Sequence, residues 1–247
     1  MQRYRPPRMA LPITFLSDYG LVDEFVGVVH GVIARLCPEA RVIDLTHGVP
    51  RHDAATGGLM LERALPFTPP GVHLAVVDPE VGARRRAVAL RTAEEDRLLV
   101  GPDNGLLMPA AARFGGAVEA VEIARSPWRL EPVSATFHGR DVFAPVAARL
   151  AAGEPLGDAG EPIDVDDLVV LERTRAVVTG DGTIVAHVLA RDAFGNLALD
   201  LDHEGLREAG LRLGQAVQVE AGDGWQPATF ARTFADVDRG RLLLYED

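Results

Sequence analysis

The residues best suited to chemistry are a carboxylate and a guanidinium on either side of one short turn. The apolar run 72–77 ends at Asp78, and Pro79 pushes that aspartate toward an extended conformation, so a buried strand would present a carboxylate at its tip. Three arginines, 84–86, open the next apolar run. Because neighbouring side chains of a strand point to opposite faces, Arg85 need not follow its neighbours and can fold back toward Asp78. The alternative is that Asp78 only braces the turn and the arginines form a solvated edge.

A second candidate is the histidine in the segment ATFHGRDVFAP, residues 135–145. His138 and Gly139 directly precede a helical pattern that runs to about Leu150, so we expect His138 at a helix N-terminus. The partial positive charge there disfavours imidazolium and keeps the ring neutral, able to accept a proton or orient a water. The alternative is a histidine that only caps its own helix. Asp141, in the first turn, is interpreted as a partner of the helix dipole.

Aspartates also stand at the ends of other expected strands. In parallel α/β sheets, ligands bind outside the carboxyl ends of the strands. Those ends carry Asp18, Asp44, Asp78 and Asp103. This recurrence favours a shared site over acids scattered across the surface. Asp44 also fits a loop-bracing role, because aspartate is a common turn residue.

The composition excludes several classes of chemistry. The chain has 247 residues and 47% hydrophobic content, ample for a packed core, and all 25 basic residues are arginine. Without lysine there is no Schiff-base chemistry, no P-loop and no kinase lysine. The single Cys37 excludes disulfides and cysteine zinc cages within the chain. None of the three serines lies in a nucleophile elbow, which argues against covalent serine catalysis.

Charge and hydropathy limit the partners. The net charge of −11 argues against a nucleic-acid backbone and suits a cationic or neutral small ligand. No apolar run approaches the roughly 20 residues that a membrane span needs, and residues 1–8 lack the apolar centre of a secretory signal. We therefore expect a cytoplasmic protein that contacts neither nucleic acid nor membrane.

Short apolar strands alternate with amphipathic helices over residues 11–152, and these elements must position the candidate residues. Strands are predicted at 13–16, 41–45, 72–77, 87–90, 98–100 and 117–123, and helices at 25–36 and in segments ending near 66, 114 and 150. This pattern predicts an α/β domain with a mostly parallel central sheet. The following stretch, 153–172, is rich in Gly, Pro and Asp and is interpreted as a linker.

The last part, residues 173–247, changes to short strands with turn signals and predicts a smaller all-β barrel domain. Strands are expected at 175–179, 183–191, 197–201, 216–220, 226–230 and 241–245, with a short helix at about 203–209. Between two of them, Asp192, Phe194 and Asn196 form a set that can grip a purine, through ring stacking, an amide on the base edge and a carboxylate for a cationic group. On spacing alone, a hairpin turn is favoured.

Five motifs occur in an order that is more specific than any one of them. They are SDYG at 17–20, DPEVG at 78–82 with the downstream Arg85, GPDNG at 101–105, FHGRD at 137–141 and DAFGN at 192–196. Over roughly residues 11–245 the chain resembles the S-adenosyl-L-methionine hydroxide adenosyltransferases, or SAM hydrolases, relatives of the fluorinases and chlorinases. The resemblance implies an N-terminal α/β domain, a C-terminal β-barrel, and homotrimers whose active sites lie between the N-terminal domain of one subunit and the C-terminal domain of the next.

The resemblance also implies a catalytic triad of Asp78, Arg85 and His138, where halogenating relatives have uncharged or aromatic residues. The chain therefore looks like the water-using branch. The sulfonium of S-adenosyl-L-methionine already activates C5′, and methionine leaves as a neutral thioether without a general acid. We expect water held by the triad to attack C5′, with its proton passing to Asp78 or His138, giving adenosine and L-methionine without a metal or organic cofactor.

The same resemblance assigns substrate contacts and exposes two departures. By similarity, Asp18 would bind the ribose hydroxyls, Asp192 the methionine amine, and Phe194 with Asn196 the region around the adenine. Glu80 stands where the family usually has glycine, which adds a negative charge beside the expected water site. Family members usually continue after the strand that ends here at Tyr245 with a segment that helps enclose the adenine, so a longer natural protein or looser binding of the base is expected.

Two other functions remain open at the level of sequence. One is a metal-dependent phosphoesterase, because several metal-compatible side chains lie near expected strand ends, although no pair has a tight ligand spacing. These side chains are Asp18, His47, His52, Asp53, Asp78, Asp103, Asn104 and His138. The other is a non-catalytic protein that binds adenosine or S-adenosyl-L-methionine.

Overall fold

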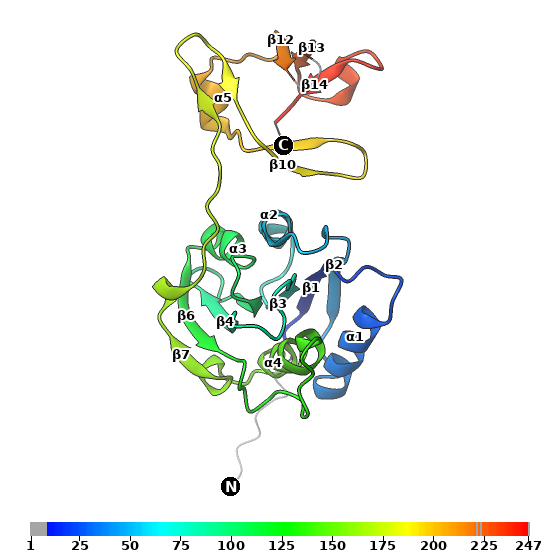
Figure 1. Ribbon diagram of the computed structural model, residues 1–247, viewed down its shortest axis with the longest axis vertical. Coiled ribbons are helices and arrows are strands. Elements are labelled where there is room, and N and C mark those ends of the chain that lie inside the picture. Colours follow the sequence, from blue (N-terminus) through cyan, green and yellow to red (C-terminus); the bar gives the residue numbers. More distant parts are fainter. Residues whose placement is uncertain (1–8, 221, 223, 247) are drawn as a thin grey trace. The chain divides into compact units, whose positions relative to one another are not determined.

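The computed structural model describes residues 9–220, 222 and 224–246, and they divide into two compact units (Figure 1). The first unit extends to Leu171 and the second begins at Glu172. Each unit has its own sheets and is described by itself.

The first unit is built on a seven-stranded sheet with the order β2-β1-β3-β5-β4-β6-β7. The strands are β1 (Ile13–Ser17), β2 (Val42–Thr46), β3 (Val72–Val76), β4 (Ala87–Thr92), β5 (Leu98–Pro102), β6 (Ala117–Glu122) and β7 (Glu161–Ile163). Pairings β1–β2, β1–β3 and β3–β5 are parallel, whereas β4 runs antiparallel to both β5 and β6, and β7 antiparallel to β6. Five strands therefore share one direction and β4 and β7 oppose it. This confirms the prediction of an α/β unit with a mostly parallel sheet.

Helices cover both faces of this sheet, with α1 and α4 on one side and α2 and α3 on the other (Figure 1). Their bounds are α1 (Phe25–Leu36), α2 (Ala54–Ala64), α3 (Met108–Arg113) and α4 (Ala144–Ala151), with a π-helical turn (Gly139–Phe143) leading into α4 and 3-10 turns at Leu65–Phe67, Leu156–Asp158 and Val165–Asp167. Among the helices of the described residues, none has both the length and the apolarity that crossing a membrane requires.

The central strands are mostly apolar because both of their faces are covered, and polar residues within them, such as Thr14 and His73, are buried and hydrogen-bonded to each other. Every residue of β1 and β3 is buried, and alternate residues enter opposite cores. Leu74 packs in the core under α1 and α4, and Ala75 in the core with α2 and α3. On the helix side, α1 buries the stripe Val26, Val29, Val32 and Ile33 at helical spacing. This packing fixes where the strands end, and so where the residues after them lie.

The stretch interpreted as a linker belongs mostly to the first unit. Residues 161–163 form β7, which pairs with β6 through Ala120 and Ile163 and makes the last strand of the sheet. On either side of β7 lie the 3-10 turns that end at Asp158 and Asp167. The Gly, Pro and Asp content of this stretch reflects tight turns and a proline-containing edge strand, since proline is tolerated at a sheet edge.

The second unit consists of short strands that form three small sheets. Their elements are β8 (Val177–Val178), β9 (Ile184–Val185), β10 (Val188–Arg191), β11 (Leu197–Leu199), α5 (His203–Glu208), β12 (Ala216–Glu220), β13 (Trp225–Phe230), a 3-10 turn (Phe234–Asp236) and β14 (Leu242–Leu244). Among the described residues, β8 pairs with β9, β10 with β11, and β12 with β13 and β14. The predicted strand-rich unit is present, but these pairings do not show a closed barrel.

Candidate active site

Asp78 and Arg85 form a bidentate ion pair at the end of β3. Asp78 lies two residues beyond Val76, and Arg85 lies in the turn before β4. Arg85 Nε donates to Asp78 Oδ1 at 2.8 Å, and Arg85 Nη2 donates to Asp78 Oδ2. The Arg85 side chain is 4% exposed and that of Asp78 is 6% exposed. Two parallel charge-assisted hydrogen bonds between nearly buried groups fix both side chains in one orientation.

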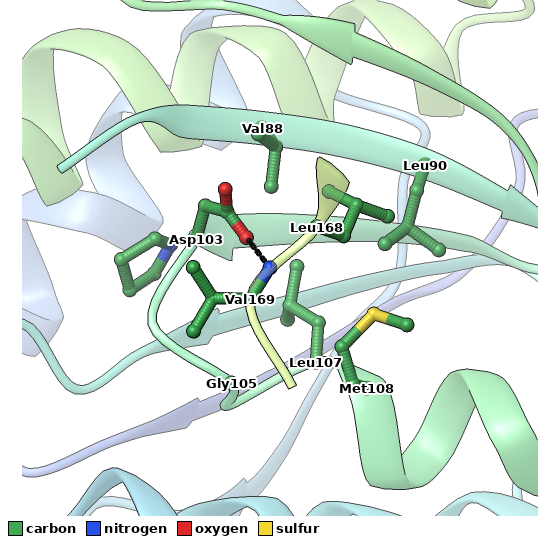
Figure 2. A pocket seen from close by; sticks show the side chains of 9 residues that line it. Val88, Leu90, Asp103, Gly105, Leu107, Met108, Leu168 and Val169 are labelled. Carbon is green, nitrogen blue, oxygen red and sulfur yellow. Dashed lines mark hydrogen bonds between the residues drawn. The ribbon is translucent and has the colours of Figure 1, made fainter. Parts of the chain in front are cut away.

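The arginines on either side of Arg85, which like it precede β4, have other surroundings. Arg84 is exposed, and Arg86 Nε donates to Asp103 Oδ2 at 2.8 Å. Asp103 Oδ1 also accepts the backbone N–H of Val169 at 2.8 Å, beside a depression that the surrounding side chains fill (Figure 2). Asp103 therefore joins β4, β5 and the segment before the second unit, and its role is structural.

Arg85 also reaches His138, the third residue of the expected triad. Arg85 Nη2 lies 3.0 Å from His138 Nδ1. Because a guanidinium can only donate, Nδ1 is the acceptor and the proton of the neutral ring is on Nε2. Partial burial, and then the positive charge of Arg85, lower the pKa of His138, while the carboxylates of Asp78 and Asp141 act in the opposite direction. Burial and Arg85 thus favour the neutral ring, the form that the sequence analysis expects for His138.

Two glycines allow the loops to approach closely enough for this contact. Gly82 has φ +76°, and a Cβ there would lie 2.3 Å from the Ala135 carbonyl oxygen. A Cβ on Gly139 would lie 2.1 Å from the Tyr19 hydroxyl. The turn before β4, the loop before His138 and the loop after β1 are therefore packed against one another. Glu80, in the same turn, is exposed and does not line the pocket described next.

The three loops enclose a pocket of about 180 Å³. It is lined by Asp18, Tyr19, His52, Val76, Asp78, Val81, Thr136, His138 and Gly139. Asp18 follows β1, and its Oδ2 accepts the backbone N–H of His52 at 3.0 Å. The structure thus brings together Asp18, Asp78 and His138, with Arg85 bonded behind them.

Sequence reasoning did not assign Tyr19 or Thr136 to this pocket, and it named His52 only among the metal-compatible side chains. Tyr19 is packed against Phe15, Phe25 and Phe137, and its pKa is raised by burial and then by the carboxylates of Asp18 and Asp78. Its position next to Asp18 was a usable signal. The position of Thr136, two residues before His138, was a weaker indication that it belongs to the site. His52 has a left-handed backbone with φ +67°, and no pattern in the sequence predicts that conformation.

The residues of the DAFGN motif form the hairpin turn between β10 and β11. Asp192 Oδ1 accepts the backbone N–H groups of Phe194 at 2.9 Å and Asn196 at 2.8 Å, and Asn196 Nδ2 donates to Asp192 Oδ2 at 2.6 Å. The hydrogen bond from Asn196 is the main cause that lowers the pKa of Asp192. Phe194 is 92% exposed, so its ring is free of packing within the unit. The turn alternative is confirmed, and the ligand-binding roles of these residues stay a prediction.

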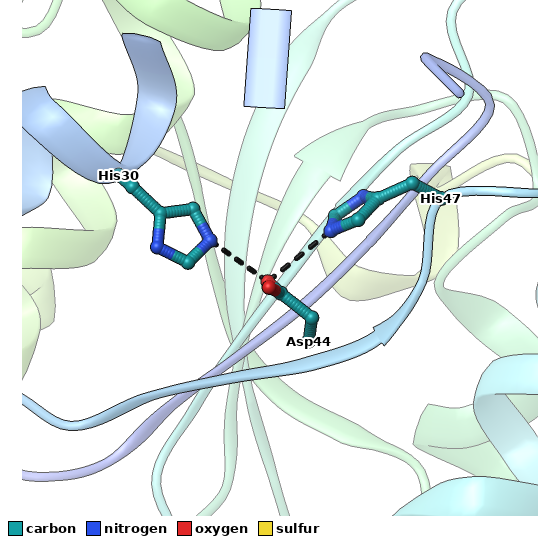
Figure 3. Close-up of side chains that lie close together, drawn as sticks. All are labelled: His30, Asp44 and His47. Atoms are coloured by element: carbon teal, nitrogen blue, oxygen red, sulfur yellow. Dashed lines mark hydrogen bonds and ion pairs between the residues drawn. The ribbon is translucent and has the colours of Figure 1, made fainter. Parts of the chain in front are cut away.

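Four metal-compatible residues of the phosphoesterase alternative, Asp18, His52, Asp78 and His138, line the pocket, but among the described residues their ligand atoms do not form a group close enough to hold one ion. Asp53 caps α2 by accepting from Thr56 N at 2.9 Å, and Asn104 Nδ2 donates to the Val77 carbonyl at 2.8 Å. Asp78 and Asp103 are each paired with an arginine. Among the described residues, the group that could hold a metal is a different one, His30, Asp44 and His47, and it does not line the pocket (Figure 3).

Comparison with known proteins gives matches over nearly the whole chain. The family models of the SAM hydroxide adenosyltransferase N-terminal and C-terminal domains match residues 13–160 and 186–247. A protein of Salinispora tropica named (R)-S-adenosyl-L-methionine hydrolase is 50% identical over 235 residues, covering 95% of this chain and 86% of the relative. A crystal structure of an uncharacterized conserved protein from Thermotoga maritima has TM-score 0.88 at 36% identity and covers 95% of this chain and 88% of that one. A fluorinase of Nocardia brasiliensis is more distant, 27% identical over 91% of this chain and 82% of its own length.

Proposed function

The chain belongs to the S-adenosyl-L-methionine hydroxide adenosyltransferase family and hydrolyses S-adenosyl-L-methionine to adenosine and L-methionine, and we propose that Asp78, Arg85 and His138 activate the attacking water. The observation that carries this proposal is the position of Arg85, which donates to Asp78 and to His138 at once. One guanidinium thereby fixes Asp78 and His138, two candidate bases that line the pocket.

The hydrogen bonds suggest how the water is held. His138 Nδ1 is occupied by Arg85, so the Nε2–H group is the one available to donate to a water oxygen. Asp78 has lone pairs beyond the two that face Arg85, so it can accept a proton from the same water. In this arrangement His138 orients the water and Asp78 is the general base, which narrows the two possibilities left open by the sequence.

The reaction needs little more than placement of that water. The oxygen attacks C5′ opposite the sulfonium, the C5′–S bond breaks with its electron pair going to sulfur, and the water proton passes to Asp78 and then to solvent. Methionine leaves as a neutral thioether, so no acid has to protonate the leaving group. We therefore propose that the reaction proceeds without a metal or organic cofactor.

Substrate contacts are proposed on both units. Asp18 is assigned to the ribose hydroxyls, and Asp192, Phe194 and Asn196 to the methionine amine and the adenine region. The pocket of about 180 Å³ is smaller than the roughly 300–1,000 Å³ of typical ligand sites, which supports completion by another surface. We propose that the C-terminal unit of a neighbouring copy, closed as a β-barrel, supplies that surface in a homotrimer, and that the enzyme works in the cytoplasm.

The test is a product analysis. Purified protein is incubated with S-adenosyl-L-methionine, and adenosine and methionine are separated by chromatography, with and without added chloride. We expect adenosine and methionine in equal amounts and no dependence on chloride. A chloride-dependent product would overturn the hydrolase mechanism, and binding without any product would favour the non-catalytic alternative.

A further inference from the structure

Three side chains outside the pocket converge on one point at the edge of the sheet. His30 comes from α1, Asp44 from β2 and His47 from the loop after β2, and both rings face the carboxylate (Figure 3). His30 Nε2 lies 2.8 Å and His47 Nε2 lies 3.2 Å from Asp44 Oδ1. The three atoms all lie within 4.8 Å of one another. Two imidazole nitrogens and a carboxylate oxygen are thus presented to a common centre.

The buried histidine of this group has a nitrogen without a hydrogen-bond partner. His47 is 5% exposed, and its Nδ1 is bonded to Ser17 Oγ at 2.8 Å. Its Nε2 is near Asp44 Oδ1, but within the described part of the chain it makes no hydrogen bond of acceptable geometry. The Phe15 ring packs edge-on against the imidazole at 4.6 Å between centroids and holds the ring in place. A buried polar atom aimed at a cluster of ligand atoms needs a partner, since leaving it unpaired is costly.

We propose that His30, Asp44 and His47 bind one divalent transition-metal cation, with Zn²⁺ as the reference ion. Zinc binds histidine nitrogen and carboxylate oxygen at about 2.0–2.2 Å, which places the ligand atoms of a tetrahedral site about 3.3 Å apart. Asp44 Oδ1 lies 2.8 and 3.2 Å from the two imidazole nitrogens, somewhat closer than that value, and all three atoms lie within 4.8 Å of one another. Two imidazoles disfavour Mg²⁺ and Ca²⁺, which prefer oxygen ligands. The side chains of His30 and Asp44 are 35% and 43% exposed, so a cation can enter from solvent and keep a water as its fourth ligand.

This site adjoins the loop that carries Asp18 but takes no part in the proposed hydrolysis. Ser17, which orients His47, directly precedes Asp18, and Gly20 N donates to the His47 carbonyl at 2.7 Å. A bound cation would fix His47 and join α1 to the edge strand β2. Its effect is therefore on the stability of the first unit and the order of this loop, while the water-activating residues are untouched.

The experiment measures metal binding by the untagged, full-length protein after chelator treatment. Zn²⁺ is titrated in competition with a chromophoric chelator, and Co²⁺ is added separately to read the coordination geometry from its visible spectrum. We expect one equivalent of Zn²⁺, a tetrahedral Co²⁺ spectrum and a higher unfolding temperature with Zn²⁺. Asp44→Asn and His30→Gln should each lower the Zn²⁺ affinity at least about 10-fold, because each removes one ligand.

The matched control is another histidine–aspartate pair that lacks a third ligand. His187 Nδ1 lies 2.8 Å from Asp200 Oδ2 in the second unit. His187→Gln should leave the stoichiometry and affinity for Zn²⁺ unchanged. The proposal is overturned if the wild type binds no Zn²⁺, or if Asp44→Asn and His30→Gln bind it as tightly as the wild type; in either case the group is a plain hydrogen-bonded cluster. Both variants change partly exposed residues, which avoids the folding defect expected from replacing buried His47. Hydrolysis by the metal-free protein is assayed in parallel, so failure of this site and failure of the proposed reaction are distinguished.

Discussion

The Asp78–Arg85–His138 group and the Asp192–Asn196 turn contain similar polar side chains but hold them in different ways. In the first group, Arg85 contacts a histidine 53 residues away, and the ion pair beneath it is nearly buried. In the turn, every hydrogen bond of Asp192 spans at most four residues and is exposed. Many β-hairpins can form such a turn, whereas only this tertiary fold assembles the triad. Convergence from distant segments is thus the stronger indication of a catalytic site.

The largest expected effect is the loss of turnover when the convergent group is broken. Asp78→Asn should lower kcat by about 10²-fold or more with little change in substrate affinity, since it removes the proposed general base. Asp103→Asn is the matched control, because Asp103 is paired with Arg86 at the same distance but stays outside the pocket. It should lower the unfolding temperature and leave kcat within about twofold. Steady-state kinetics and thermal unfolding check both variants, and equal losses of kcat would indicate a folding defect.

The stability of the first unit should depend on pH, because this unit buries the neutral imidazole of His73 in its core. Burial, and then the charge of Arg97, lower the pKa of His73 to about 3 from an ordinary value of 6.5. Between these values the unfolded chain binds the proton and the folded chain does not, so stability is lost as pH falls from 6.5 toward 3. From pH 7 to pH 4.5 this residue should lower the free energy of unfolding by on the order of 3 kcal/mol.

Denaturant unfolding at the two pH values measures this loss. A His73→Gln variant is the comparison, since glutamine does not titrate in this range. Its loss between pH 7 and pH 4.5 should be clearly smaller than that of the wild type, whatever its stability at pH 7. If the free energy of unfolding fell by the same amount between pH 7 and pH 4.5 in both proteins, the loss would not be due to His73.

A smaller effect is expected at the edge of the convergent group. Asp18→Ala should raise KM for S-adenosyl-L-methionine about 10-fold and change kcat by only a few-fold, because a lost hydrogen bond to a charged group is worth about 1.5–3 kcal/mol. Steady-state kinetics separate the two constants. A fall in kcat at unchanged KM would instead place Asp18 in the chemical step.

The smallest effect is expected in the Asp192–Asn196 turn, where a substitution tests whether the exposed Phe194 ring binds the substrate. Phe194→Ala should leave the unfolding temperature unchanged, because the ring is exposed, and raise KM about fivefold if it stacks on adenine. Phe234→Ala, in the same unit, is the control: that ring is partly exposed but packs against Tyr245, so its loss should affect stability instead. An unchanged KM in Phe194→Ala would remove this residue from the binding site.

Parts of the fold were predictable from the sequence where a residue pattern can arise from only one kind of structure. Strands β1 and β3 were predictable because burial on both faces leaves a largely apolar run. Arg85 and Arg86 have different partners, as expected from the idea that Arg85 need not follow its neighbours, although both precede β4. The composition of the stretch 153–172 did not reveal β7 within it, because turns, edge strands and linkers share the same residues, and only the partner strand distinguishes them.

The sequence indicated features of the site that depend on neighbouring residues, but not those that depend on contacts between distant segments. Neutral His138 was expected, but its cause, burial beside Arg85, depends on a contact that spacing does not show. Asp44 was assigned either to a shared site at the strand ends or to bracing its loop, and His30 was not singled out, because it lies within the helical pattern of α1. Only the packing of α1 beside β2 brings His30 and Asp44 together.

The position of β7 decides how this chain can be divided. If the first unit were cut after residue 152, β6 would still pair with β4, but its other edge at Ala120–Glu122 would lose β7 and become an open edge that favours self-association. Cutting after Leu171 keeps that edge covered and retains the Val169 N–H that bonds Asp103. The short strand β7 thus covers an edge that would otherwise favour aggregation. A fragment of the first unit prepared for study in isolation should include it.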